Sequence, residues 1–136
     1  MRTVQELTEQ WCRDHGVTAQ SEPGRVAFSV DGANGSFPGA VLPLEEERAM
    51  VCLFGLGTYV PESARDEAAR QLAALNFPLR LGAVFLNRDT GELSLRVTQL
   101  LPPEDEAAAA LIDRLLPSAA NAMDALLPAL TRLCCL

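Results

Sequence analysis

The sequence contains no lysine, one histidine, one tryptophan and no long apolar run. Its 11 basic residues are all arginine, and they stand against 18 acidic residues, so the net charge is −7. Binding to nucleic acid or to an acidic membrane surface requires a positively charged patch, and both halves of this chain are acidic. No segment approaches the ~18 apolar residues of a membrane-spanning helix. We therefore expect neither a nucleic-acid partner nor a membrane.

The cysteine spacing matches no zinc or redox motif; the four residues are Cys12, Cys52, Cys134 and Cys135. With His15 as the single histidine, few metal ligands are available, and we expect no metal site and no cofactor. We expect Cys12 and Cys52 to be small buried apolar residues, and Cys134 and Cys135 to be free thiols at a frayed end. His15 stands at a predicted helix end, where its position favours a contact with the helix dipole over catalysis.

Catalytic and phosphate-binding motifs are also missing. The sequence has no GxSxG elbow, no P-loop and no GxGxxG, and the Gly55-Leu56-Gly57 segment lacks a third glycine. Two acidic runs, Glu45–Glu47 and Glu104–Glu106, have the character of solvated turn and helix-start charges, without the burial that separates the pKa values of catalytic carboxylates. We expect the protein not to be an enzyme.

One domain over residues 1–136 accounts for the chain, because no linker or low-complexity segment interrupts it. The first ten residues carry Glu6 and Glu9 and lack the apolar stretch of a signal peptide. We therefore expect a cytoplasmic protein.

The first half of the sequence predicts a helix followed by three strands. Thr3 to Glu6 has the pattern of a capping box, which predicts a helix that ends near His15. Alternation predicts a strand over residues 26–30. The next strand, over residues 37–44, contains two prolines and is expected at a sheet edge or with imperfect pairing. The apolar segment 49–56 predicts a strand buried on both faces.

The second half predicts a helix, two strands and a long helix. The helix begins near Pro61 and ends at Asn76, which can adopt the left-handed conformation there. Two strands over residues 81–86 and 93–98 follow, the second with one wet face. The apolar stripe of the last helix keeps its phase through two prolines, which predicts one kinked helix or two nearly collinear ones. The fold class is therefore α+β, with a five-stranded antiparallel sheet in the order αβββαββα.

Apolar residues exceed what five strands obviously bury. One interpretation places all of them in the core; the other assigns the surplus to a dimer interface or to a groove for a partner. The candidate partner or dimer surface consists of Trp11, Phe28, Leu42, Leu95, Val97, Met123, Leu126 and Leu130.

From Tyr59 onward the sequence resembles the YbjN family and, more distantly, the CesT-like class I type III secretion chaperones. The resemblance rests on segments 60–62, 72–76, 81–86 and 90–96, and residues 123–130 resemble the end of YbjN proteins. It implies a chaperone-like α+β fold that dimerises and binds proteins. YbjN relatives are described as regulators of bacterial sensory transduction and stress responses. The tryptophan expected near the last helix of many secretion chaperones is missing here.

Three hypotheses follow. The first is a cytoplasmic, homodimeric module, chaperone-like or regulatory, that binds a protein partner through apolar surface. The second is a type III secretion chaperone that holds one effector segment. The third is a domain that binds a small ligand or lipid in a cavity between the sheet and the final helix.

Overall fold

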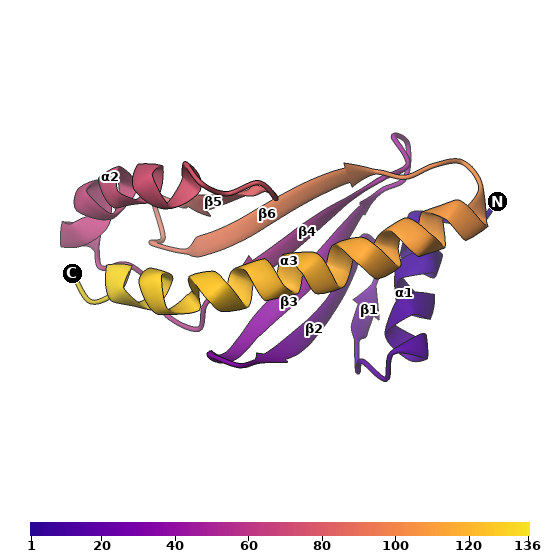
Figure 1. Cartoon of the computed structure of the whole chain (residues 1–136), viewed down its shortest axis with the longest axis horizontal. Coiled ribbons are helices and arrows are strands. Elements are labelled where there is room, and N and C mark those ends of the chain that lie inside the picture. The colour runs from indigo at the N-terminus through magenta and orange to yellow at the C-terminus, as the bar shows by residue number, and fades with distance from the viewer.

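The computed structural model describes all 136 residues and consists of an antiparallel sheet with helices against one face (Figure 1). The helices are α1 (Val4–Asp14), α2 (Arg65–Asn76) and α3 (Asp105–Leu133), and a short 3-10 turn, η1 (Glu62–Ala64), precedes α2. The strands are β1 (Gln20–Glu22), β2 (Arg25–Gly32), β3 (Gly35–Leu44), β4 (Ala49–Gly55), β5 (Ala83–Leu86) and β6 (Leu93–Leu100). Their order across the sheet is β1-β2-β3-β4-β6-β5. The long helix α3 crosses one face of the sheet, with α1 beside its first half and α2 near its C-terminal end.

The α+β class is confirmed, but the sheet has six strands and the element order is αββββαββα. The additional strand is β1, which pairs with residues 25–27 at the edge of the sheet. All three of its residues are polar and exposed. A strand without buried residues has no alternation of apolar side chains, so the sequence pattern could not reveal it.

The sequence predicted that the proline-containing strand lies at a sheet edge or is paired imperfectly. β3 is not an edge strand, because it pairs with β2 on one side and β4 on the other, but its pairing is incomplete at both prolines. The two prolines occupy positions where β3 is paired on one side alone. Pro38 lies opposite Ser29 of β2, beyond the paired part of β4, whereas Pro43 lies opposite Met50 of β4, beyond the paired part of β2. Each proline thus stands where β3 has a single neighbour, so its missing N–H removes no bond from a second ladder.

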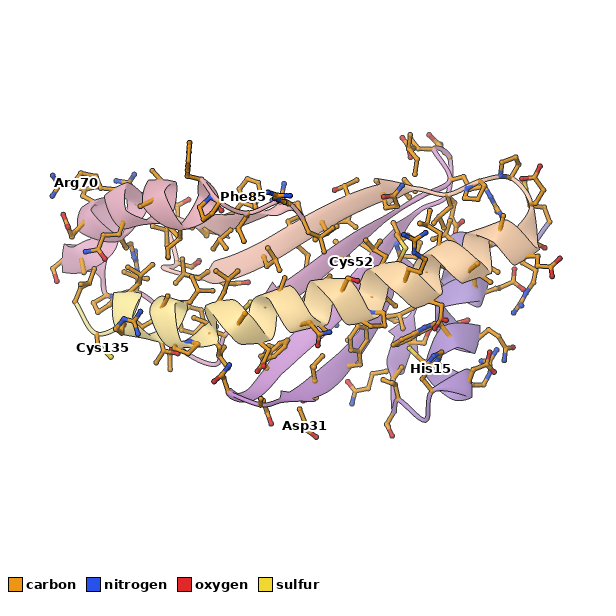
Figure 2. The ribbon with its side chains drawn as sticks, viewed as in Figure 1. His15, Asp31, Cys52, Arg70, Phe85 and Cys135 are labelled. Atoms are coloured by element: carbon orange, nitrogen blue, oxygen red, sulfur yellow. The ribbon has the colours of Figure 1, made fainter.

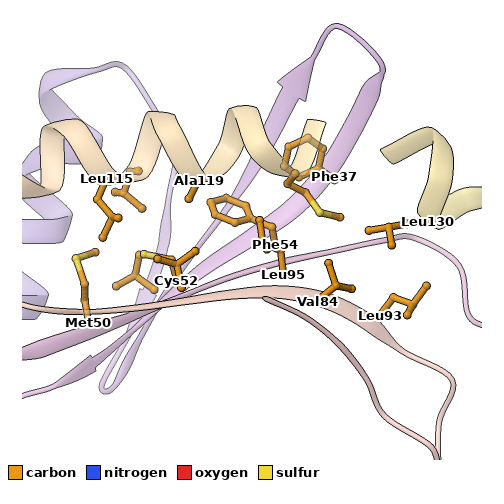
Figure 3. Close-up of a cluster of buried hydrophobic side chains, with 14 of the residues drawn as sticks. Phe37, Met50, Cys52, Phe54, Val84, Leu93, Leu95, Leu115, Ala119 and Leu130 are labelled. Carbon is orange, nitrogen blue, oxygen red and sulfur yellow. The ribbon is translucent and has the colours of Figure 1, made fainter. Parts of the chain in front are cut away.

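The core fills the space between the sheet and α3 (Figure 3). From the sheet, Met50, Cys52, Phe54 and Leu95 point towards α3, and each is at most 1% exposed. The facing stripe of α3 is buried over its whole length; it consists of Ala108, Ile112, Leu115, Leu116, Ala119, Met123, Leu127, Leu130 and Leu133. The apolar stripe of the last helix is therefore buried in the core of the molecule.

Helix α3 is a single helix that continues through Pro117 and Pro128, as the phase of its stripe predicted. Each proline stands four residues after an aspartate, in the segments Asp113-Arg-Leu-Leu-Pro and Asp124-Ala-Leu-Leu-Pro. The two segments are eleven residues apart, close to three helical turns, so they share one side of the helix. The carboxylate of the first aspartate accepts a hydrogen bond from Trp11 of α1, and that of the second accepts one from Asn34 in the turn between β2 and β3. This short repeat was not recognised in the sequence.

The N-terminal end of α1 is fixed by side chains from its own first turn and from the β3–β4 turn. Thr3 and Glu6 form the predicted capping box. The Glu45 carboxylate accepts from the backbone N–H groups of Val4 and Gln5 at 2.8 and 3.1 Å. A carboxylate at this position also faces the positive end of the helix dipole. Part of the acidic run at residues 45–47 is therefore a helix cap.

No helix of the structure combines the length and the apolar character that crossing a bilayer requires.

Candidate functional site

The face of the sheet opposite α3, here called the outer face, carries no helix. It is formed by the alternate residues of β3 to β6, which are Ser36, Pro38, Ala40, Leu42, Leu44, Ala49, Val51, Leu53, Gly55, Ala83, Phe85, Ser94, Arg96, Thr98 and Leu100. Most of these residues are apolar. Leu100, Phe85 and Leu44 are the most exposed of the large ones, at 66%, 44% and 38%. The outer face is thus apolar over β3 and β4, and β6 adds a polar row of Ser94, Arg96 and Thr98 between β4 and β5.

Arg96 is the single charged residue on the outward side of β3 to β6, and Arg25 of β2 and Glu92 stand at the groove on the same side of the sheet. The Arg96 guanidinium carbon lies 4.2 Å from the centre of the ring of Phe85, which belongs to the neighbouring strand β5 and is labelled in Figure 2. A guanidinium stacked on an aromatic ring is satisfied in part by the ring and is less strongly hydrated than an ammonium group. Arg96 is therefore a charged residue suited to an interface.

A groove of about 380 Å³ runs along the middle of the outer face. Its apolar lining is Pro38, Leu42 and Leu53, together with Leu56 and Tyr59 from the segment after β4, and Arg25 and Glu92 also line it. The Tyr59 side chain is 58% exposed. An exposed aromatic ring beside an apolar groove is typical of a residue that anchors a protein contact.

The edge strands offer little room for strand addition. In β5, the side-chain amide of Asn76 donates to the carbonyl of Val84 at 2.9 Å and accepts from its N–H at 2.7 Å. It occupies the backbone groups that a further strand would use. The opposite edge strand, β1, has three residues, and the Gln5 amide bonds both the Glu22 carbonyl and the Gly24 N–H in the turn that follows. Short or occupied edges disfavour pairing with another chain, so the outer face is the larger available surface.

The structure divides the eight residues predicted as a partner or dimer surface. Leu95, Val97, Met123 and Leu130 are at most 4% exposed and lie in the core, so their assignment to a surface was wrong. The reason is that α3 turns its whole apolar stripe onto the sheet.

The other four of those residues are half-buried and accessible. Leu42 belongs to the outer face. Trp11 and Phe28 line a pocket on the helical side of the sheet. Leu126 packs at the margin of the core. A partner role for these four stays a prediction.

Residues 51, 53, 59 and 85 of the outer surface were missed, although the sequence contained a signal for two of them. The segment 49–56 is apolar at every position, which predicted burial on both faces. In β4, however, only the face towards α3 is covered, and Val51 and Leu53 stay half-buried on the other. Strands of this composition are normally covered on both faces, so the second, uncovered face was a signal in the sequence.

The reactive side chains form no evident chemical site. Burial raises the pKa of the Cys52 thiol to about 12 and also raises the pKa of Cys12, so neither is a ready nucleophile. All four cysteines are free. No three His, Cys, Asp or Glu side chains lie together in a group that could hold a metal ion.

Comparison with known proteins gives a family and a fold. The model of the family described as "YbjN: Putative bacterial sensory transduction regulator" matches residues 5–132. No curated protein matches the sequence. Among solved structures, the chain is similar to the crystal structure of YbjN, "a putative transcription regulator from E. coli". That similarity has a TM-score of 0.66 at 14% identity and covers 94% of this chain and 96% of the other.

Proposed function

This chain belongs to the YbjN family, and from that premise we propose that it is a non-enzymatic regulatory module that acts by binding proteins through its outer face. We further propose that it works in the cytoplasm as a homodimer, with a second copy of the chain as the occupant of that face. A partner protein would compete with the second copy for the same apolar surface.

The observation that carries this proposal is the uncovered side of β4. Val51 and Leu53 stand on a strand whose sequence is apolar on both faces, and no element of the chain covers their side. Strands with this composition are normally covered on both faces. A partner that buries the outer face would remove this apolar surface from water, at about 25 cal/mol for each Å² of apolar area.

Charge supports a second copy as the occupant. Two copies of a chain of net charge −7 repel each other over most of their surfaces. On the outer face the outward residues of β3 and β4 carry no charge, and Arg25, Glu92 and Arg96 stand around them, so like-charge repulsion is small there. A two-fold dimer joins the same patch of both subunits, and an almost uncharged apolar patch is complementary to itself.

The size of the face predicts a moderate affinity. Strands about 4.8 Å apart, with about 3.4 Å per residue, give this face an area on the order of 500 Å². Standard interfaces bury about 800 Å² per partner, and weaker ones bury less. We therefore expect a dimer that dissociates on dilution and can exchange its second copy for a partner.

The oligomeric state of surface variants tests the proposal. Light scattering of the wild type at tens of micromolar should give twice the chain mass of 14.6 kDa. Leu53→Glu places a carboxylate in the middle of the outer face and should give a monomer with unchanged far-UV circular dichroism. Ala73→Glu, on an exposed position of α2, is the matched control and should stay dimeric. A monomeric wild type, or a dimeric Leu53→Glu variant, would contradict the proposal.

The alternative of a type III secretion chaperone uses the same groove for an extended effector segment. It predicts that such a segment co-purifies with the wild type from its native host and is lost with Leu53→Glu. A host genome without a secretion apparatus would exclude it.

A further inference from the structure

A second apolar site lies on the helical side of the sheet, between the end of α1, β2 and the middle of α3. This pocket has a volume of about 330 Å³. Its walls include Trp11 and His15 from α1, Phe28 and Val30 from β2, and Leu116 and Ala120 from α3. We propose that this pocket binds a small, mostly apolar, uncharged molecule that carries one hydrogen-bonding group. The proposal does not depend on the homodimer.

The size of the pocket suits a small molecule. An engineered apolar cavity of about 150 Å³ is sufficient to hold benzene, and this pocket has about twice that volume. Natural ligand pockets begin at about 300 Å³. A ligand of one or two rings therefore fits, with part of it at the open side.

The side-chain walls present ring faces and methyl groups, because the polar side-chain atoms of Trp11 and His15 are already bonded. The Trp11 Nε1–H donates to the Asp113 carboxylate at 3.0 Å. His15 stacks on Trp11 with ring centres 4.3 Å apart, and its two nitrogens lie 2.9 Å from the Trp11 carbonyl and 2.9 Å from the Asp113 carboxylate (Figure 2). Pro117, which also lines the pocket, has no N–H. The two rings are thus held in place and offer little to a charged ligand.

The floor of the pocket depends on a glycine. A Cβ added to Gly39 would lie 2.8 Å from the Phe28 ring and 2.9 Å from the Phe54 ring. The absence of a side chain lets both rings lie against β3, where they meet edge to face with centres 6.3 Å apart. The pocket is therefore a formed aromatic surface.

The open side of β2 offers a partner for the hydrogen-bonding group of the ligand. Strand β1 pairs with residues 25–27 of β2, so from residue 28 onward β2 has one neighbouring strand, β3. Backbone groups on its other side stand beside the pocket. Asp31 contributes to the lining of the pocket, but its carboxylate accepts from the Ser36 hydroxyl at 2.6 Å on the outer side of the sheet. The Asp113 carboxylate, which contacts the Trp11 and His15 rings, and the net charge of −7 both disfavour an anionic ligand.

Titration with a matched pair of probes tests the proposal. The neutral probe is p-cresol, and the anionic probe is 4-methylbenzoate, which has a similar shape. Trp11 is the only tryptophan, so its indole N–H gives a single nuclear magnetic resonance signal that reports on the pocket. We expect a saturable shift of this signal with p-cresol and at least tenfold weaker binding of 4-methylbenzoate.

Two substitutions fill the pocket from opposite walls, and two controls leave it intact. Ala120→Leu and Val30→Phe should each weaken p-cresol binding at least tenfold. Ala125→Leu, an exposed position on the same helix, should not. Leu53→Glu should also bind normally, which separates this site from the outer face. The absence of a saturable shift, equal binding of both probes, or unchanged binding by both pocket-filling variants would overturn the proposal.

Discussion

The side-chain amide of Asn34 donates to the backbone carbonyl of Asp124 at 3.0 Å, and this is the carbonyl that Pro128 leaves without its intrahelical donor. The Asp124 carboxylate in turn accepts from the backbone N–H groups of Ala33 and Asn34 at 3.2 and 2.9 Å. The β2–β3 turn and α3 are thus joined in both directions. A Cβ on Gly32 would lie 2.1 Å from the Asp124 carboxylate, so this turn requires a glycine for the contact.

Removal of the Asn34 amide should destabilise the protein because it leaves the Asp124 carbonyl without its protein donor. We expect Asn34→Ala to lower the free energy of unfolding by about 1–2 kcal/mol, measured by urea denaturation. In a Pro128→Ala background the substituted position regains a backbone N–H for this carbonyl, so Asn34→Ala should cost less there. Equal losses in both backgrounds would show that the proline has no part in the contact.

Asn76 should protect the β5 edge. Asn76→Ala leaves the N–H and carbonyl of Val84 unpaired, and we expect a loss of about 1–3 kcal/mol in the free energy of unfolding. The uncovered edge should also promote association, visible as larger species in light scattering. Gln71→Ala, at an exposed position of the same helix, serves as the control. If Asn76→Ala behaved like this control, the pairing with Val84 would have no stabilising role.

The four thiols should differ in reactivity. The thiolate is the reactive form, and a pKa of about 12 leaves Cys52 almost wholly protonated at pH 8. Burial raises the pKa of Cys12 in the same direction. With Ellman's reagent we expect Cys135 to react first and Cys134 next, whereas Cys12 and Cys52 react only after unfolding in urea. Rapid reaction of all four in the native protein would contradict the buried positions of the latter two.

Asp105 should contribute to stability in a pH-dependent way. The Arg2 backbone N–H and the Arg48 guanidinium hold the pKa of Asp105 below its ordinary value of 3.8. A lowered pKa stabilises the folded state above pH 3.8, and this stabilisation is lost as the pH falls through the folded-state pKa. The unfolding midpoints of the wild type and Asp105→Asn should therefore differ at pH 6 and converge near pH 2. Glu104→Gln, an exposed neighbour, should show no such convergence.

Local sequence patterns predicted those features of the fold that depend on residues close together in the chain. The capping box at Thr3 is present, and α3 runs through its two prolines because the apolar phase continues across them. Asn76 does end α2, but it has no positive φ; its side chain bonds Val84 instead, a contact eight residues away that no local pattern contains.

The candidate site was harder to predict because it depends on which face of the sheet the helices pack against. From the sequence alone, the apolar stripe of α3 could equally have been exposed, and the strand over residues 49–56 could have been covered on both faces. Packing α3 onto one face buried Leu95 and Met123 and left Leu53 uncovered. Which face α3 covers is decided by packing between elements far apart in the sequence, and the periodicity of a single helix or strand does not contain this information.

The most direct test of the outer face is to detect contacts between two copies of the chain. In a sample that mixes isotopically labelled and unlabelled protein, filtered nuclear Overhauser spectra record only contacts between subunits. We predict such contacts for the methyl groups of Leu42, Val51 and Leu53, together with the Phe85 ring, at concentrations where the protein is dimeric. Intersubunit contacts confined to the helical side, or none at any of these groups, would contradict the account.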